Sequence, residues 1–106
     1  MSDDDRLALK DKIIVNLQTV YDPEIPVDIY KLGLIYDIEV SDESNAKIQM
    51  TLTSPNCPAA QTLPADVETK TRETEGVNSV DVEVVFEPAW TPELMEDSAK
   101  LELNIL

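Results

Sequence analysis

The sequence predicts a small α/β (α+β) protein, a two-layer sandwich with elements in the order α-β-β-α-β-α and a mixed three-stranded sheet. Three observations lead to this class. The chain opens with apolar residues at helical spacing, and three later stretches alternate apolar and polar residues. The two glycines and most of the seven prolines fall between these stretches. With 106 residues, the chain is expected to form one domain, residues 1–106.

The first helix is predicted over about residues 5–21. Its apolar stripe consists of Leu9, Ile13, Ile14, Leu17, Val20 and Tyr21. Three aspartates at positions 3–5 place negative charge at its N-terminus, which the helix dipole favours. Asp22-Pro23 is expected to end it, because the residue before a proline avoids the α region.

The segment 22–33 has an unusual composition for a loop. It combines two prolines with the apolar residues Ile25, Val27, Ile29, Tyr30 and Leu32. So many apolar side chains predict a connection that packs on the core and is held rigid. Asp28 is expected to cap a single helical turn that Gly33 closes.

Three strands are predicted from residues that alternate between two faces. Their apolar faces are Leu34, Tyr36, Ile38 and Val40; Ala46, Ile48, Met50 and Leu52; and Val80, Val82, Val84 and Phe86. Residues 41–45 have the length of a hairpin turn. A helix joins the second and third strands, which should therefore run parallel through a right-handed crossover.

Two more helices are expected. The second should run from near Pro58 to Glu75, with Gly76 as its C-terminal cap. Its buried side would carry Ala59, Ala60, Leu63 and Val67. Pro64 costs about 3 kcal/mol inside a helix, which predicts a kink or a late start.

The last helix should begin with Thr91 as N-cap and Pro92 at its first position. Its apolar residues are Leu94, Ala99, Leu101 and Ile105. Trp90 is expected to pack this helix against the sheet or against a partner.

Charge excludes several functions. Twenty-two acidic residues against eight basic ones give a net charge of −14, which repels nucleic-acid phosphates and anionic membrane surfaces. No apolar run is long enough to cross a bilayer, and the acidic start lacks a signal-peptide pattern, so a cytoplasmic location is expected. Cationic partner surfaces or metal ions fit this charge, although acidity can also serve solubility alone.

The cysteine and histidine counts limit the disulfides, metal sites and catalytic groups that the chain can form. One cysteine allows no internal disulfide, which suits a reducing compartment, and one chain alone cannot build a four-thiolate metal site. The absence of histidine excludes Cys–His pairs, Ser–His–Asp triads and His-ligated metals. The chain is therefore not expected to be an enzyme.

Cys57 is the leading candidate for a functional residue. It lies between Pro55 and Pro58, after a predicted strand and at the start of a predicted helix. Lone cysteines are often small buried hydrophobes, but ends of elements are where functional sites gather. The helix dipole lowers a thiol pKa by less than about one unit, and nearby carboxylates oppose this effect. Metal coordination deprotonates a thiol outright, which favours a ligand over a nucleophile.

Three further residues are candidates near Cys57. Asp22 and Glu24 flank Pro23 in the packed loop, where they could also serve only helix termination and solvation. Thr53 ends the second predicted strand and points toward the same junction as Cys57, and its hydroxyl could instead cap the turn.

Three motifs together resemble one family. Residues 22–36, DPEIPVDIYKLGLIY, resemble the DPE and LGL-I-Y signature of the iron–sulfur assembly domain found in SufT and in PaaD-type proteins. Residues 51–58, TLTSPNCP, look like the cysteine motif of that family, and residues 88–95, PAWTPELM, like its C-terminal W-T-P motif. The motifs occur in the family's order and spacing and span nearly the whole chain. Pro64 and Asn104 depart from the family pattern.

The resemblance implies a small α/β fold and a part in maturing iron–sulfur proteins, in SufT-like relatives by assembling or delivering clusters. PaaD-like relatives belong to a phenylacetate-oxygenase system. By position, Asp22, Glu24, Thr53 and Cys57 correspond to the family's proposed site, with Cys57 as the metal ligand. The implied partners are assembly proteins and apo-client proteins.

Two functional hypotheses follow. In the first, Cys57 is a labile ligand of a transient iron–sulfur cluster. One thiolate per chain holds a cluster loosely, so stable binding would need a homodimer that pairs two Cys57 residues, or ligands from a client or a small thiol. In the second, the protein is a metal-free adaptor that docks clients through its acidic surface and Trp90. A cysteine enzyme is a remote third alternative.

Overall fold

The computed structural model describes residues 2–21, 27–53 and 62–102. Its elements are α1 (Asp3–Leu17), β1 (Ile35–Val40), β2 (Asn45–Met50), α2 (Leu63–Arg72), β3 (Ser79–Val84), the 3₁₀ helix η2 (Pro92–Leu94) and α3 (Asp97–Glu102). This order confirms the predicted α-β-β-α-β-α arrangement, with η2 as an addition. The predictions for Ile25, Ala59, Ala60, Asn104 and Ile105 fall outside the described residues.

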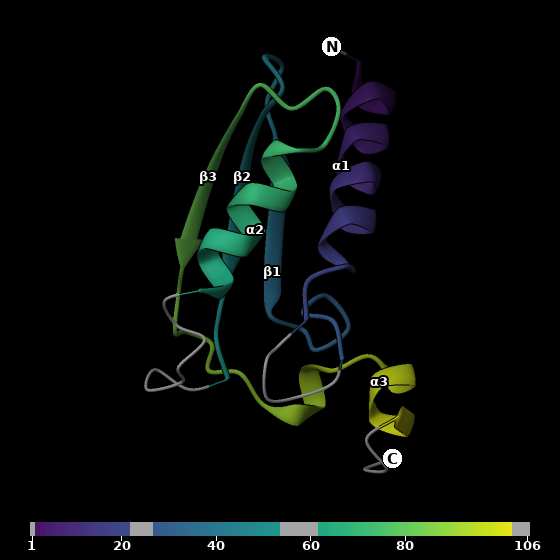
Figure 1. Ribbon diagram of the computed structural model, residues 1–106, viewed down its shortest axis with the longest axis vertical. Coiled ribbons are helices and arrows are strands. Elements are labelled where there is room, and N and C mark those ends of the chain that lie inside the picture. Colours follow the sequence, from purple (N-terminus) through teal and green to yellow (C-terminus); the bar gives the residue numbers. More distant parts are fainter. Residues whose placement is uncertain (1, 22–26, 54–61, 103–106) are drawn as a thin grey trace.

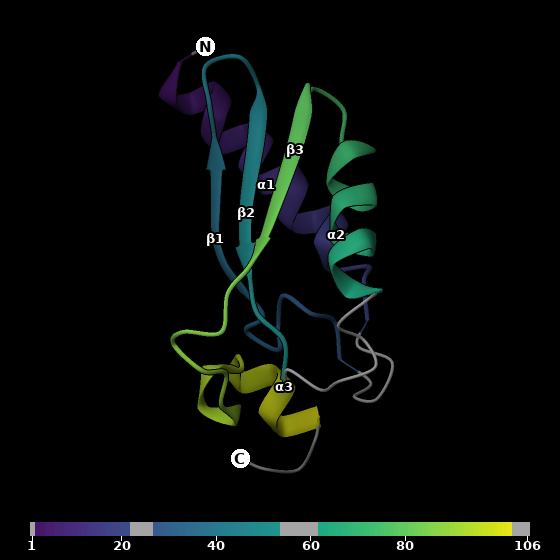
Figure 2. The ribbon, with the colours of Figure 1, turned by 90° about the vertical axis from the view of Figure 1, so that its left-hand side faces the viewer.

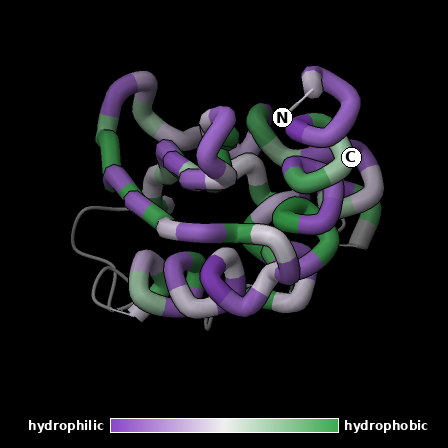
Figure 3. Tube along the Cα trace, turned by 90° about the horizontal axis from the view of Figure 1, so that it is seen from above, coloured by the Kyte–Doolittle hydropathy of each residue, from purple (hydrophilic) through white to green (hydrophobic). Residues whose placement is uncertain are grey.

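The sheet has the order β1-β2-β3. β1 pairs antiparallel with β2, and β2 pairs parallel with β3, which confirms the predicted mixed sheet. Helices α1 and α2 cover one face of it, while no helix of the described residues covers the other face (Figures 1 and 2). In the view from above, hydrophobic and hydrophilic stretches are interspersed along the described part of the chain (Figure 3).

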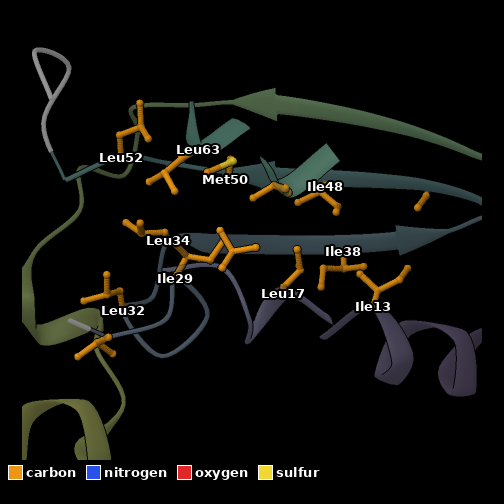
Figure 4. Packing of buried hydrophobic residues seen from close by; sticks show 14 of the residues in the cluster. Ile13, Leu17, Ile29, Leu32, Leu34, Ile38, Ile48, Met50, Leu52 and Leu63 are labelled. Atoms are coloured by element: carbon orange, nitrogen blue, oxygen red, sulfur yellow. The ribbon is translucent and has the colours of Figure 1, made fainter. Parts of the chain in front are cut away.

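The core lies between the helices and the sheet (Figure 4). Its fully buried members include Ile13 and Leu17 of α1, Ile48 and Met50 of β2, and Leu63 of α2. These are the residues that the helical and strand periodicities assigned to the core. The prediction of one buried face per element is therefore confirmed for α1, β2 and α2.

Helix α1 starts with a capping box. The Ser2 hydroxyl accepts the Asp5 N–H at 3.1 Å, and the Asp5 carboxylate accepts the Ser2 N–H at 3.4 Å. The prediction that the helix runs to Tyr21 is wrong, because it ends at Leu17. The N–H of Val20 bonds the Leu17 carbonyl in a tighter turn, and Tyr21 leaves the helix with 59% of its surface exposed.

Helix α2 begins at Leu63 with Pro64 in its first turn, which confirms the predicted late start. Its end differs from the prediction, because the helix stops at Arg72 and not at Glu75. The Thr74 hydroxyl bonds the Lys70 carbonyl and accepts the amide of Asn16 in α1 at 2.7 Å. The Thr74 N–H bonds the Thr71 carbonyl at 3.1 Å in a tighter turn, so the chain leaves the α-helix before it reaches the predicted cap. Gly76, with φ of +98°, lies in the turn toward β3.

Strand β1 contains an irregularity that alternation did not predict. Ile35 pairs with Met50 and Asp37 with Gln49, so Tyr36 is an extra residue in the ladder. Consequently Ile35, and not Tyr36, stands opposite the buried Met50. The prediction that Tyr36 continues the core face is wrong, and its hydroxyl instead donates to the Pro88 carbonyl at 2.6 Å.

The third strand and the last helix are shorter than predicted. β3 ends at Val84, and Phe86 lies beyond it with 46% of its surface exposed, since β2 ends at the opposing Met50. The predicted last helix is broken into η2 and α3 because the Glu96 N–H bonds the Lys31 carbonyl at 2.9 Å. Leu94 and Leu101, which were assigned to the apolar residues of this helix, are 43% and 63% exposed.

Candidate functional site

Asp22, Glu24 and Cys57 lie outside the described residues, so their mutual arrangement stays a prediction. Thr53 is described and is half-buried at the end of the segment that follows β2. The structure shows how the chain on either side of these positions is held. The residues next to them lie at the end of the molecule that also carries η2 and α3 (Figure 1).

A capped single turn over residues 28–33 organises this end of the molecule. The Asp28 carboxylate accepts the N–H groups of Tyr30 and Lys31 at 3.1 and 3.0 Å and is buried. At the other end, Gly33 has φ of +81°, and the Leu34 N–H bonds the Ile29 carbonyl at 3.1 Å. This geometry confirms the predicted turn with Asp28 as its cap and Gly33 as its closing residue.

We call this turn together with Val27 and Leu34 the loop platform (residues 27–34). It joins the two chain segments that lead to the candidate residues. On one side the Ile29 N–H bonds the Val20 carbonyl at 2.9 Å, directly before Tyr21. On the other side the Leu34 carbonyl accepts the Thr51 N–H at 2.8 Å, two residues before Thr53. The described segments that end at Tyr21 and at Thr53 are therefore both hydrogen-bonded to the loop platform.

The C-terminal segment (residues 86–101) packs under the loop platform. The Trp90 indole N–H donates to the Leu32 carbonyl at 2.7 Å. A Cβ atom added to Gly33 would lie only 2.4 Å from the Leu94 carbonyl oxygen, so the two backbones are in direct contact. Trp90 is partly buried against the core and bonds the loop platform, whereas it was predicted to pack the last helix against the sheet or against a partner.

Replacing Trp90 with phenylalanine should lower the free energy of unfolding by about 1 kcal/mol, because the ring can still pack but the bond to the Leu32 carbonyl is lost. Urea unfolding followed by circular dichroism measures the change. Tyr36→Phe is the matched control, since it removes a hydroxyl that bonds the Pro88 carbonyl nearer to solvent, and its cost should be smaller. If both variants lose the same free energy of unfolding, the bond from Trp90 to Leu32 stabilises the protein no more than the exposed bond from Tyr36 to Pro88.

Thr51 is a residue that sequence reasoning missed. Side chains alternate between the two faces of a strand, so Thr51 would share the open face of the sheet with Lys47 and Gln49. Only 1% of its surface is exposed, however. Its hydroxyl oxygen has no hydrogen-bond partner among the described residues. A buried hydroxyl without a partner costs about 1–3 kcal/mol, so Thr51 is a candidate donor toward the same junction as Thr53. Thr51 lies two residues before Thr53 within the cysteine motif, and this position was the sequence signal that could have identified it.

The described residues alone do not form a metal centre. Among residues 2–21, 27–53 and 62–102, no group of three or more acidic, cysteine or histidine side chains is placed to hold an ion. Asp28, the one buried carboxylate of the described residues, already accepts two backbone N–H groups. None of the helices in the described part of the chain has the length and apolar character to cross a membrane.

Residues 10–84 match the model of the iron–sulfur cluster assembly protein family, a range from α1 to the end of β3. The chain belongs to this family. All four candidate residues lie within the matched range, whereas Trp90, η2 and α3 lie beyond it.

Two relatives and one solved structure match this iron–sulfur assembly protein over most of its length. It is 45% identical to an Fe-S protein maturation auxiliary factor of Porphyromonas gingivalis, over 94% of this chain and 95% of the relative. It is 37% identical to the Fe-S protein maturation auxiliary factor SufT of Staphylococcus aureus, over 81% and 98%. The crystal structure of a domain of unknown function from Bacillus anthracis is 39% identical and superposes with a TM-score of 0.91, covering 99% of this chain and 100% of that one.

Proposed function

We propose that this chain is an auxiliary factor of iron–sulfur protein maturation that helps to build or deliver clusters to client proteins, and that it is not an enzyme. The observation that carries the proposal is the family match, which spans all three strands and all four candidate residues. The maturation factors of P. gingivalis and S. aureus, at 45% and 37% identity, support the same role.

Cys57 would act as a labile ligand of a cluster carried as cargo. A single thiolate supplies one of the four cysteine ligands that such clusters usually take, so it holds the cargo loosely. Weak holding suits transfer, because a carrier must also release. Stable binding would then need a second Cys57 from a homodimer, or ligands from the client or a small thiol.

The loop platform supports a shared site for Cys57, Asp22, Glu24 and Thr53. It is bonded both to the chain before Asp22 and to the chain before Thr53. Rigid support is what a binding site needs if its side chains are to meet in one geometry. In this proposal Thr53 and the two carboxylates orient the cargo, while the thiolate of Cys57 provides the metal bond.

Anaerobic reconstitution with ferrous iron and sulfide tests the role of Cys57. Wild-type protein should bind iron and sulfide and transfer them to an apo-client, and Cys57→Ser should fall to the background of a protein without thiols. The control is Cys57→Ser combined with Ser98→Cys, which restores one thiol at an exposed position of α3. If Cys57→Ser matches wild type, or if the Ser98 thiol restores binding equally well, the ligand role is wrong.

A metal-free adaptor is the second candidate, and one observation favours it. Phe86, Leu94 and Leu101 of the C-terminal segment are between 43% and 63% exposed, which is the surface a docked partner would cover. Client capture that persists in Cys57→Ser, together with no reconstituted cluster in wild type, would select this function. In either case the partners would be assembly proteins and apo-clients in the cytoplasm, and a PaaD-like phenylacetate role stays an alternative.

A further inference from the structure

The outer edge of β3 has no partner strand within the described part of the chain, because the sheet order places β3 at one side of β2 only. A strand with one neighbour leaves alternate backbone N–H and C=O groups unpaired. The geometry points to this edge as a docking site for a partner protein. The partner segment would be extended, would alternate apolar residues with lysine or arginine, and would add to the sheet as a fourth strand.

β3 lacks most of the features that protect an edge strand. Such features include charged side chains, above all lysine, as well as proline and bulges, and of these β3 carries only the acidic residues Asp81 and Glu83. The opposite edge, β1, has such a bulge at Tyr36. By contrast, all six residues of β3 pair with β2 in unbroken register, and none of them is lysine, proline or glycine. β3 is therefore the better template for strand addition.

The helix-facing side of β3 is incompletely covered. Val80, Val82 and Val84 remain partly exposed, whereas their partners in β2, namely Ala46, Ile48 and Met50, are at most 2% exposed. Apolar residues of an added strand would lie beside the three valines and remove this surface from water. This explains why alternate residues of the partner should be apolar.

The open side of β3 determines the charge of the partner. Asp81 and Glu83 are exposed there. The Glu83 Oε2 atom lies 3.8 Å from the Nζ atom of Lys47 in β2. No described residue forms an ion pair with Asp81. Opposite charges on neighbouring strands stabilise pairing, whereas like charges oppose it. Lysine or arginine at the intervening positions of the partner would therefore complement β3.

A second copy of this chain fits the edge poorly. Antiparallel pairing of two β3 strands about Val82 would place Asp81 of one copy opposite Glu83 of the other. Parallel pairing in register would place each acidic residue beside its own counterpart. Both arrangements join like charges, and each chain carries a net charge of −14. The inference goes beyond the proposed function, because strand addition at this edge involves no cluster and no thiol.

NMR titration of ¹⁵N-labelled protein with a synthetic peptide tests this inference. The peptide is as long as β3 and alternates valine with lysine, and a second peptide replaces each lysine with glutamate. The lysine peptide should shift the amide signals of β3 and slow their hydrogen exchange, while the glutamate peptide should not bind. Asp81→Asn with Glu83→Gln should weaken the affinity about tenfold.

The matched control is Glu39→Gln with Glu43→Gln, which removes the same charge from exposed positions at the β1 side of the molecule. It should leave the affinity nearly unchanged. Equal weakening by both double variants would show attraction to overall charge and would overturn the proposal. Absence of binding, or signal changes centred away from β3, would do the same. Dimerisation of the free protein through β3, seen by sedimentation and NMR, would identify a second copy as the occupant instead.

Discussion

Gly33→Ala is expected to destabilise the protein by about 3 kcal/mol, through backbone strain and a steric clash. Gly33 has φ of +81°, a conformation that alanine adopts only with strain. The new Cβ would also lie 2.4 Å from the Leu94 carbonyl oxygen, a backbone atom that cannot move without displacing η2. The C-terminal segment should therefore detach from the loop platform, which urea unfolding and limited proteolysis near Leu94 would detect.

Gly76→Ala distinguishes the cost of backbone strain from the cost of a steric clash. Gly76 also has a positive φ, of +98°, but its added Cβ would meet only the flexible Leu9 side chain at 3.4 Å. Its cost should be about 1 kcal/mol, which corresponds to the strain alone. If both glycine variants lose the same stability, the close contact between Gly33 and Leu94 makes no energetic contribution.

Ile48→Ala should lower the free energy of unfolding by about 4 kcal/mol, since it leaves a cavity in the centre of the core. Ile48 is fully buried in the middle strand, between Ile38 of β1 and Val82 of β3 in register. A loss of this size is a large fraction of the 5–15 kcal/mol typical of such proteins, so the variant should unfold at much lower urea concentration.

Val82→Ala is the companion to Ile48→Ala. Val82 pairs directly with Ile48 but lies on the partly exposed edge strand, and its truncation should cost only about 1 kcal/mol. Denaturant midpoints of the two variants give the comparison. A Val82 loss as large as that of Ile48 would mean that the edge of β3 is as tightly packed as the centre of the sheet.

Much of the fold follows from local patterns. Alternating residues such as Ile48 and Met50 can bury one face only as a strand, and Leu9, Ile13 and Leu17 share one side only in a helix. The turn capped by Asp28 and closed by Gly33 was also predictable, because both devices act within a few residues. The lengths of the elements were less predictable. Contacts with distant segments act at these boundaries: Asn16 bonds Thr74 just beyond the end of α2, and the bond between Lys31 and Glu96 interrupts the predicted last helix.

For the candidate site, sequence motifs identified Asp22, Glu24, Thr53 and Cys57, and the family match covers all four. Thr51 escaped detection because parity assigns it to the open face of the sheet. Its burial depends on the loop platform, whose Leu34 carbonyl binds the Thr51 N–H across seventeen positions of sequence.

By itself, the sequence determined the class of fold, the buried face of most elements and the family, because periodicity and motifs are properties of neighbouring residues. The tertiary structure alone decided three other features: the extra residue at Tyr36, the docking of the C-terminal segment on Gly33 and Leu32, and the unpaired edge of β3. Each of these depends on which distant backbone groups meet, and hydrogen bonds or close contacts between such groups leave no local pattern.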